Sequence, residues 1–196
     1  YAFRKSITKS ILYILIGLSG YIFIAQYLKL QSLHTYADLS HWVQIVQSIF
    51  ISWIPKSLNS EFIFSGTTNY FAVHFTPFIY LFAPIFRIFP YPETLLLLQG
   101  VFMFSAGIPL YLLARKVQQN TLFALLVVVV YLWYPTFQYI TMYEFEMLRF
   151  SIPILLWMIY FWEQKRLSLY FFFVLLAILV REEVGLTIGM FGISIF

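Results

Sequence analysis

The chain contains no cysteine and few charged side chains for its 196 residues. The absence of cysteine excludes disulfides, thiolate nucleophiles and Cys-ligated zinc or iron–sulfur sites. Charged residues make up 10% of the sequence, against about 25% in an average soluble domain, which is too little polar surface for a soluble fold. Hydrophobic residues make up 62%, in runs near the roughly 20 residues that a helix needs to cross a bilayer. The composition therefore predicts an all-α, polytopic transmembrane helical bundle.

The twelve lysines and arginines form no basic stripe, although the formal net charge is +4. A nucleic-acid partner is therefore not expected. The basic residues lie at the ends of apolar runs, where they act as topology signals, because cytoplasmic loops are enriched in Lys and Arg. Arg4, Lys5 and Lys9 precede the first run, so we predict a cytoplasmic N-terminus. The pairs Arg115-Lys116 and Lys165-Arg166 predict two further cytoplasmic turns.

Six apolar segments are predicted to span the membrane, at about residues 11–28, 94–114, 121–139, 148–162, 167–180 and 184–196. Two other segments are predicted to lie at the membrane surface without crossing it. Residues 39–54 are amphipathic, and residues 71–89 are interrupted by Pro77 and Pro84. We treat residues 1–196 as a single transmembrane domain. Because the chain begins at Tyr1 rather than Met and stops at Phe196 inside an apolar run, we expect it to be part of a longer protein.

The first candidate site is the interval between the first two predicted spans, which holds all three histidines. Asp38 precedes the amphipathic segment and could cap a helix there. The same helix N-terminus would keep the carboxylate ionised, so that it could also take a proton from an acceptor hydroxyl. His74 opens an apolar segment, either as an interfacial histidine or as a functional one. Asp38 and His41 could join it around a metal ion, but no tight ligand motif exists and no metal site is predicted.

Charged residues interrupt the apolar sequence at two further places. Glu144 lies in Tyr143-Glu-Phe-Glu-Met-Leu-Arg149, which is either a solvated turn or a second acidic loop. Arg181 and Glu182 lie in Val180-Arg-Glu-Glu-Val184, a run without a Gly or Pro turn residue. This run is either a tight connection between helices or a site for a phosphate-bearing lipid headgroup, since arginine binds phosphate well. The basic turns place both segments on the same membrane face as Asp38 and His74.

Five blocks of this sequence resemble an uncharacterised family of predicted bacterial and archaeal membrane proteins, over about residues 36–190. The blocks are Ala37-Asp-Leu-Ser-His-Trp-Val-Gln44, Val73-His-Phe-Thr-Pro-Phe-Ile-Tyr-Leu-Phe-Ala-Pro84, Pro109-Leu-Tyr-Leu-Leu-Ala-Arg115, Tyr143-Glu-Phe-Glu146 and Leu179-Val-Arg-Glu-Glu-Val184. That family in turn resembles the GT-C glycosyltransferases, including the protein O-mannosyltransferases. The resemblance implies a GT-C-like N-terminal module with juxtamembrane helices in the first outer loop.

The resemblance also implies a set of roles. Asp38 would be the catalytic acid of the first outer loop and Glu144 the catalytic acid of the second. His74, Arg181 and Glu182 would bind the phosphate of a polyprenyl-phosphate sugar donor. The implied location is the plasma membrane of a bacterium or archaeon, with membrane lipid as a partner; the sequence identifies no cofactor.

Two alternatives to the glycosyltransferase hypothesis remain open. The first is a non-catalytic subunit or scaffold of a membrane protein complex that binds lipid, pigment or partner helices, because fold does not imply function. The second is a transporter, which the charges favour but the lack of an evident repeat or central pair of broken helices does not.

Overall fold

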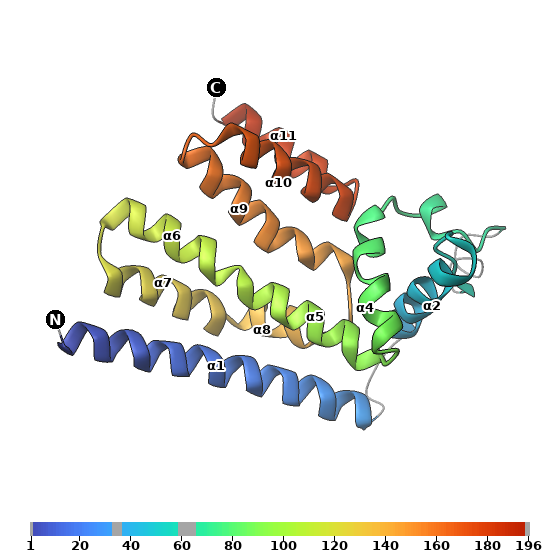
Figure 1. Ribbon diagram of the computed structural model, residues 1–196, viewed down its shortest axis with the longest axis horizontal. Helices are drawn as coiled ribbons and strands as arrows, with labels where there is room; N and C mark the ends of the chain where they lie inside the picture. Colours follow the sequence, from blue (N-terminus) through green and yellow to red (C-terminus); the bar gives the residue numbers. More distant parts are fainter. Residues whose placement is uncertain (1, 33–36, 59–65, 195–196) are drawn as a thin grey trace.

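The computed structural model describes residues 2–32, 37–58 and 66–194, and their regular structure is helical (Figure 1). These residues form no strand, only an isolated antiparallel bridge between Lys56 and Asn69. The α-helices are α1 (Ala2–Gln31), α2 (Ala37–Ser52), α4 (Ala83–Ile88), α5 (Pro92–Ser105), α6 (Gly107–Gln118), α7 (Thr121–Trp133), α8 (Pro135–Met142), α9 (Ser151–Glu163), α10 (Leu167–Val180) and α11 (Val184–Ser194). The short 3₁₀ helices are η1 (Tyr70–Ala72), η2 (Pro77–Leu81) and η3 (Met147–Phe150). The all-α prediction is confirmed.

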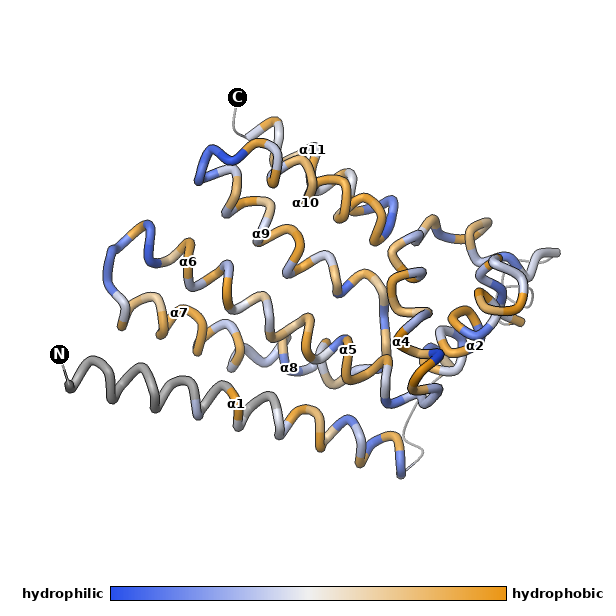
Figure 2. Tube along the Cα trace, in the orientation of Figure 1, coloured by the Kyte–Doolittle hydropathy of each residue, from blue (hydrophilic) through white to orange (hydrophobic). Residues whose placement is uncertain are grey.

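The long helices run lengthwise beside one another, and the segments from α2 to α4 gather at one end of them (Figure 1). α1 ends and α5 begins at this end, which we call the α2 end. Polar residues concentrate at the ends of the helices and apolar residues along their middles (Figure 2). At the opposite end, Lys116 Nζ lies 2.8 Å from Glu163 Oε2, which joins the α6–α7 turn to the α9–α10 turn. The structure therefore places both basic turns away from α2.

Among the described residues, one helical stretch, Pro92–Gln118, is both long and apolar enough to cross a membrane. The pair α7 and α8 forms a second candidate if the two helices act as one span. The helices α10 and α11 are apolar but have only 14 and 11 residues, fewer than the roughly 17 that a straight span requires. The structure thus has fewer full-length spans by this measure than the six that the sequence predicts.

Residues 121–139 do not form the single helix that was predicted. α7 ends at Trp133, and α8 begins at Pro135 after a bend of 52°. The pyrrolidine ring of a proline disfavours the helical conformation in the preceding residue, and Tyr134 has extended φ and ψ angles of −60° and 126°. The bend directs α8 toward the 143–150 segment at the α2 end.

Large apolar side chains on the long helices face outward. Val130, Phe171, Leu186 and Met190 are 66%, 62%, 77% and 69% exposed. Exposed apolar surface of this extent is unfavourable in water but suits contact with lipid tails. The outer face of the bundle is therefore compatible with a membrane.

An aromatic core lies beneath the polar residues of the α2 end. Ring centroids are 5.6 Å apart for Trp42 and Phe145, 5.6 Å for Phe145 and Phe150, and 4.7 Å for Phe82 and Phe150. Edge-to-face and tilted pairs at such distances each contribute about 0.5–1.5 kcal/mol beyond the area they bury. The core joins α2, the segment before α4 and the 143–150 segment into one platform.

The topology predicts which positions share a membrane side, and the absence of cysteine allows single-cysteine labelling without background. We expect cysteines introduced at Ser32 and Tyr91 to react with an impermeant maleimide from the same, non-cytoplasmic side. A cysteine at Gln164 should react only from the cytoplasmic side. All three positions, Ser32, Tyr91 and Gln164, are exposed in the structure. Labelling of the Tyr91 variant from the cytoplasm alone would show that residues 71–89 complete a crossing.

Candidate functional site

The α2 end gathers polar residues from four separate segments. They come from the first turn of α2, the segment before η2, residues 143–149 and the turn between α10 and α11. Among them are all five residues that the sequence predicts for the site. In the structure, His74 contacts both Arg181 and Glu182. Asp38 and Glu144 lie apart from these three residues, and each takes part in a different contact between α2 and the 143–144 segment.

Two adjacent contacts join the start of α2 to the 143–144 segment. The Tyr143 hydroxyl donates to Asp38 Oδ2 at 3.4 Å, and the backbone N–H of Leu39 donates to Glu144 Oε2 at 2.7 Å. Asp38 is the second residue of α2 and remains partly exposed. A side chain from the remote loop, rather than Asp38, therefore satisfies this first-turn N–H of the helix. Asp38 is left with an accessible carboxylate.

Glu144 is almost fully buried, with 2% of its surface exposed. Its Oε1 atom has no hydrogen-bond partner among the described residues, and Glu144 lines a small cavity together with Gln26 and Lys29. The free-energy cost of burying this carboxylate is offset partly by its hydrogen bond to the α2 N-terminus, where the helix dipole also favours negative charge. The geometry gives Glu144 a structural connection to α2 and little access to a substrate.

Gln99 on α5 forms hydrogen bonds with the backbone from the end of α8 to Glu146. It has no exposed surface, and its Nε2 donates to the carbonyls of Thr141 and Glu144 at 3.4 and 3.3 Å. Its Oε1 accepts from the N–H of Glu146 at 2.8 Å. One buried amide thus satisfies three backbone groups that no helix pairs, as a buried site requires.

A second group of side chains centres on His74. Its Nδ1 lies 2.8 Å from Glu182 Oε1, and its Nε2 lies 2.5 Å from Arg181 Nη2. The second Glu182 oxygen accepts from the backbone N–H of Phe75 at 2.9 Å. Partial burial opposes ionisation of Glu182, but these hydrogen bonds outweigh it and hold the pKa of that carboxyl below its usual value. Both oxygens of the Glu182 carboxylate therefore accept hydrogen bonds from residues 74 and 75, and these bonds fix the position of that segment.

Arg181 connects this group to the 143–149 segment. Its Nη1 lies 3.3 Å from Glu146 Oε1, and its Nη2 lies 3.4 Å from Glu183 Oε1. Tyr70 lies close by, with its ring centroid 6.0 Å from that of His74. Burial raises the pKa of the Tyr70 hydroxyl, and the negative charge of Glu146 adds to the shift. Tyr70 therefore stays neutral and can donate a hydrogen bond.

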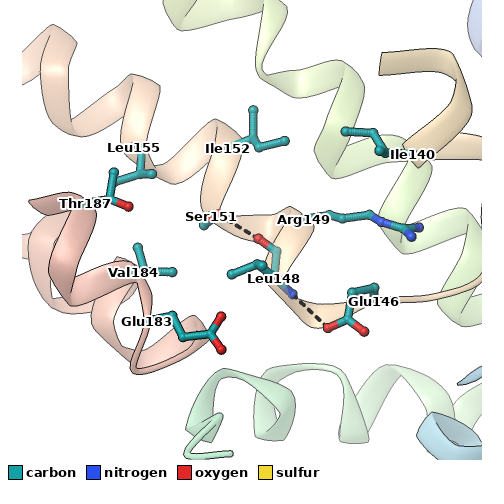
Figure 3. Close-up of a pocket in the computed structure, with 10 residues that line it drawn as sticks. All are labelled: Ile140, Glu146, Leu148, Arg149, Ser151, Ile152, Leu155, Glu183, Val184 and Thr187. Atoms are coloured by element: carbon teal, nitrogen blue, oxygen red, sulfur yellow. Dashed lines mark hydrogen bonds between the residues drawn. The ribbon is translucent and has the colours of Figure 1, made fainter. Parts of the chain in front are cut away.

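Arg149 links the Asp38 region to a cavity of about 500 Å³ (Figure 3). Its guanidinium carbon lies 5.1 Å from the centroid of the Tyr143 ring, and it donates to the carbonyl of Glu144. Burial lowers the pKa of Arg149, while the charges of Glu146 and Asp38 oppose the shift. Arginine still remains a cation, since its ordinary pKa is far above neutrality.

The cavity has a charged end and an apolar wall. Glu146, Arg149 and Glu183 line the charged part (Figure 3). The apolar wall comes from α8, α9 and α11 and includes Ile152 and Leu155. Because α9 and α11 run away from the charged end, this apolar surface lies farther along the helices. A molecule with a polar head and an apolar tail would match this distribution, with Arg149 as the cationic group among the charged side chains.

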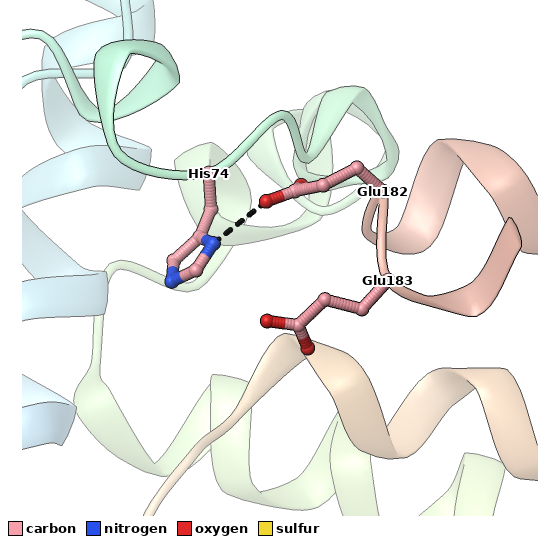
Figure 4. Close-up of side chains that lie close together, drawn as sticks. All are labelled: His74, Glu182 and Glu183. Carbon is pink, nitrogen blue, oxygen red and sulfur yellow. Dashed lines mark hydrogen bonds and ion pairs between the residues drawn. The ribbon is translucent and has the colours of Figure 1, made fainter. Parts of the chain in front are cut away.

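Three side chains at this end could hold a metal ion. Ligand atoms of His74, Glu182 and Glu183 lie within 4.8 Å of one another (Figure 4). This set differs from the Asp38, His41 and His74 combination considered from the sequence. His41 instead contacts the Ser57 hydroxyl at 2.6 Å, and burial lowers its pKa, although Asp38 opposes that shift.

Sequence reasoning missed several residues of this region as site residues. Tyr70 and Gln99 carry no charge and lie in ordinary aromatic and apolar surroundings, so no local signal marked them. Glu146, Arg149 and Glu183 stand in segments that the charge pattern did single out. Their roles depend on contacts with residues far away in the chain.

Comparisons with known proteins identify a family but no relative of known activity. The family model described as a predicted membrane protein, DUF2079, matches residues 29–196. No curated protein and no solved structure gives a significant match. The predicted resemblance to a family of membrane proteins is confirmed, and the GT-C resemblance is not shown by these comparisons.

The Glu144 contact predicts a difference between two substitutions. Glu144→Gln retains an oxygen that can accept from the Leu39 N–H, whereas Glu144→Leu leaves that buried donor unpaired. An unpaired buried group costs about 1–3 kcal/mol, so we expect the Leu variant to be less stable than the Gln variant by that order. Thermal melts of the detergent-solubilised proteins measure the difference. Equal melting temperatures for the two variants would exclude a structural role for this hydrogen bond.

Proposed function

The chain belongs to the DUF2079 family of predicted membrane proteins, and from the contacts of its polar site we propose that it is a GT-C-like glycosyltransferase. Its donor would be a sugar carried on a polyprenyl phosphate. Such a reaction needs a base for the acceptor, cations for the leaving phosphate and an apolar surface for the lipid. The α2 end provides a candidate for each.

The observation that carries the proposal is the position of Tyr143 between a carboxylate and an arginine. Its hydroxyl contacts Asp38, and its ring lies against Arg149, which also lines the 500 Å³ cavity. An accessible carboxylate and an arginine-bearing cavity therefore adjoin one another. A base and a phosphate-binding group separated by one side chain suit a transfer between an acceptor hydroxyl and a lipid phosphate.

In the proposed reaction the acceptor hydroxyl attacks the anomeric carbon of the donor sugar. The new C–O bond forms as the bond between that carbon and the phosphate oxygen breaks, and the bonding electrons leave with the phosphate. Asp38 takes the hydroxyl proton, in the role of a general base. Arg149, assisted by Arg181, stabilises the negative charge that develops on the departing phosphate.

The contacts favour different roles for the other predicted residues. Glu144 is buried and bonded to the Leu39 N–H, so we propose that it positions Asp38 through α2 rather than acting as a second catalytic acid. His74 binds Glu182, and Glu182 also accepts a hydrogen bond from the backbone N–H of Phe75. We propose that they hold Arg181 near the phosphate instead of contacting the phosphate first.

A specific observation also favours the non-catalytic alternative. Arg181 is surrounded by groups of its own chain: Glu146, Glu183 and the acceptor nitrogen of His74. A scaffold would keep such charges permanently paired, whereas an enzyme must exchange some of these contacts for a phosphate. Assay of the protein across a panel of polyprenyl-phosphate sugars separates the two: turnover supports the enzyme, and its absence across the panel supports the scaffold.

The base assignment predicts the behaviour of Asp38→Asn. Asparagine keeps the size of the side chain and can still accept from the Tyr143 hydroxyl, but it cannot take the acceptor proton. We expect turnover of a radiolabelled polyprenyl-phosphate sugar to fall by about 10²–10⁴-fold, the usual contribution of a general base. The melting temperature should stay near that of the wild type. Glu93→Gln, which removes a carboxylate outside the site, is the matched control; undiminished turnover in the Asp38 variant would remove Asp38 from the mechanism.

The cavity assignment predicts a chain-length effect. Leu155→Trp should fill part of the apolar wall and raise KM for a long-chain donor by about tenfold or more, since the buried lipid surface stabilises binding. KM for a truncated, water-soluble donor should change little. Leu175→Trp, on the outward face of α10 where Leu175 is 56% exposed, is the control. Equal effects of Leu155→Trp on both donors would place the lipid elsewhere.

A further inference from the structure

We propose that His74, Glu182 and Glu183 bind a divalent transition-metal ion, and that this ion competes with the Arg181 guanidinium for His74. The site is separate from the proposed transfer reaction, because it requires only that these side chains bind an ion. Its test therefore measures metal binding without turnover.

The three side chains converge from two segments. His74 lies between η1 and η2, while Glu182 and Glu183 lie in the turn between α10 and α11. Figure 4 shows the two carboxylates on either side of the space beside the imidazole, and the candidate ligand atoms are within 4.8 Å of one another. One imidazole and two carboxylates, with positions left for water, suit Zn²⁺, Mn²⁺ or Fe²⁺ better than Mg²⁺, which prefers oxygen ligands alone.

The electrostatic balance around His74 favours an additional cation. The carboxylates of Glu146 and Glu183 pair with the Arg181 guanidinium, and the carboxylate of Glu182 pairs with His74. The guanidinium is also incompletely satisfied, since its buried Nε has no hydrogen-bond partner among the described residues. Arg181 therefore does not use all of its hydrogen-bond donors in this position. A divalent ion, with twice the charge of a guanidinium, would neutralise more of the negative charge of the carboxylates than Arg181 does alone.

The hydrogen-bond pattern of His74 makes the two cations mutually exclusive there. Arg181 can only donate, so His74 Nε2 accepts from it and Nδ1 carries the hydrogen that is donated to Glu182. A metal ion on Nε2 would take the lone pair that Arg181 uses. A metal ion on Nδ1 would displace the hydrogen from that nitrogen, so the neutral ring would carry its one hydrogen on Nε2. Nε2 would then be a donor facing the N–H donor of Arg181, and the two could not form a hydrogen bond. With either nitrogen as ligand, Arg181 must leave His74.

Metal binding would therefore release Arg181 from the imidazole. The neighbouring partner of Arg181 is Glu146, which lines the charged part of the 500 Å³ cavity. We infer that a bound ion would leave the guanidinium free to turn toward that cavity. The ion would then act on the cavity through Arg181 as well as through its own charge.

The decisive experiment is a titration of the detergent-solubilised protein with Mn²⁺, followed by electron paramagnetic resonance and checked by Zn²⁺ displacement. We expect one ion per chain in the wild type and at least about tenfold tighter binding in Arg181→Gln, because the variant loses a competing positive charge a few ångströms away. His74→Gln and Glu183→Gln should each weaken binding by about tenfold or more. Glu163→Gln, a carboxylate at the opposite end of α9, should bind like the wild type.

Whether Arg181→Gln tightens or weakens Mn²⁺ binding shows which role Arg181 has. Tighter binding indicates that Arg181 competes with the ion, and weaker binding indicates that it only supports the structure of the site. A folded Arg181→Gln protein that binds Mn²⁺ more weakly than the wild type would overturn the proposal. So would the absence of stoichiometric binding in both proteins, or binding that His74→Gln and Glu183→Gln leave unchanged. If Arg181→Gln does not fold, failure of the wild type to bind an ion, or binding that Glu183→Gln leaves unchanged, would still overturn the proposal, since half of the Glu183 side chain is exposed and its substitution leaves the core intact.

Discussion

A buried hydrogen bond between the Leu39 N–H and the Glu144 carboxylate connects α2 to the 143–150 segment, and the polar end of the molecule depends on it. The first N–H groups of a helix lack partners within the helix, and the helix dipole favours negative charge near them. A carboxylate from a segment 105 residues away meets both needs. The same contact brings Asp38 beside Tyr143, so the position of the candidate base follows from how α2 is anchored.

The irregular part of the 143–150 segment requires its own support, because buried backbone groups outside a helix still need hydrogen-bond partners. Gln99 on α5 satisfies two of these groups and the Thr141 carbonyl at the end of α8, and the aromatic side chains of Phe145 and Phe150 fix the segment in the core. Glu146 and Arg149 of the segment line the cavity, whereas Glu144 is buried against α2. Rigid support of this kind is what a binding site needs if its side chains are to keep their positions.

The charges of the α2 end largely satisfy one another. Arg181 is shared between Glu146, Glu183 and His74, whereas Arg149 contacts a backbone carbonyl and an aromatic ring and lines the cavity. The two arginines are therefore not equivalent. Arg149 can meet an anionic ligand where it stands, while Arg181 must first exchange a contact.

The sequence by itself determined that the protein is helical and belongs in a membrane, because hydropathy and charge are properties of local segments. It also marked Asp38, His74, Glu144, Arg181 and Glu182, since ionisable residues in apolar sequence stand out. Only the tertiary structure decided their contacts. Glu144 is buried against α2, Glu182 holds His74, and Gln99 supports a loop that no sequence signal linked to it. The bend at Pro135 likewise replaced a predicted continuous helix. The three side-chain contacts depend on pairs of residues from about 40 to more than 100 positions apart, whose proximity is set by the packing of whole helices. The bend, in contrast, follows from the local effect of Pro135 on Tyr134.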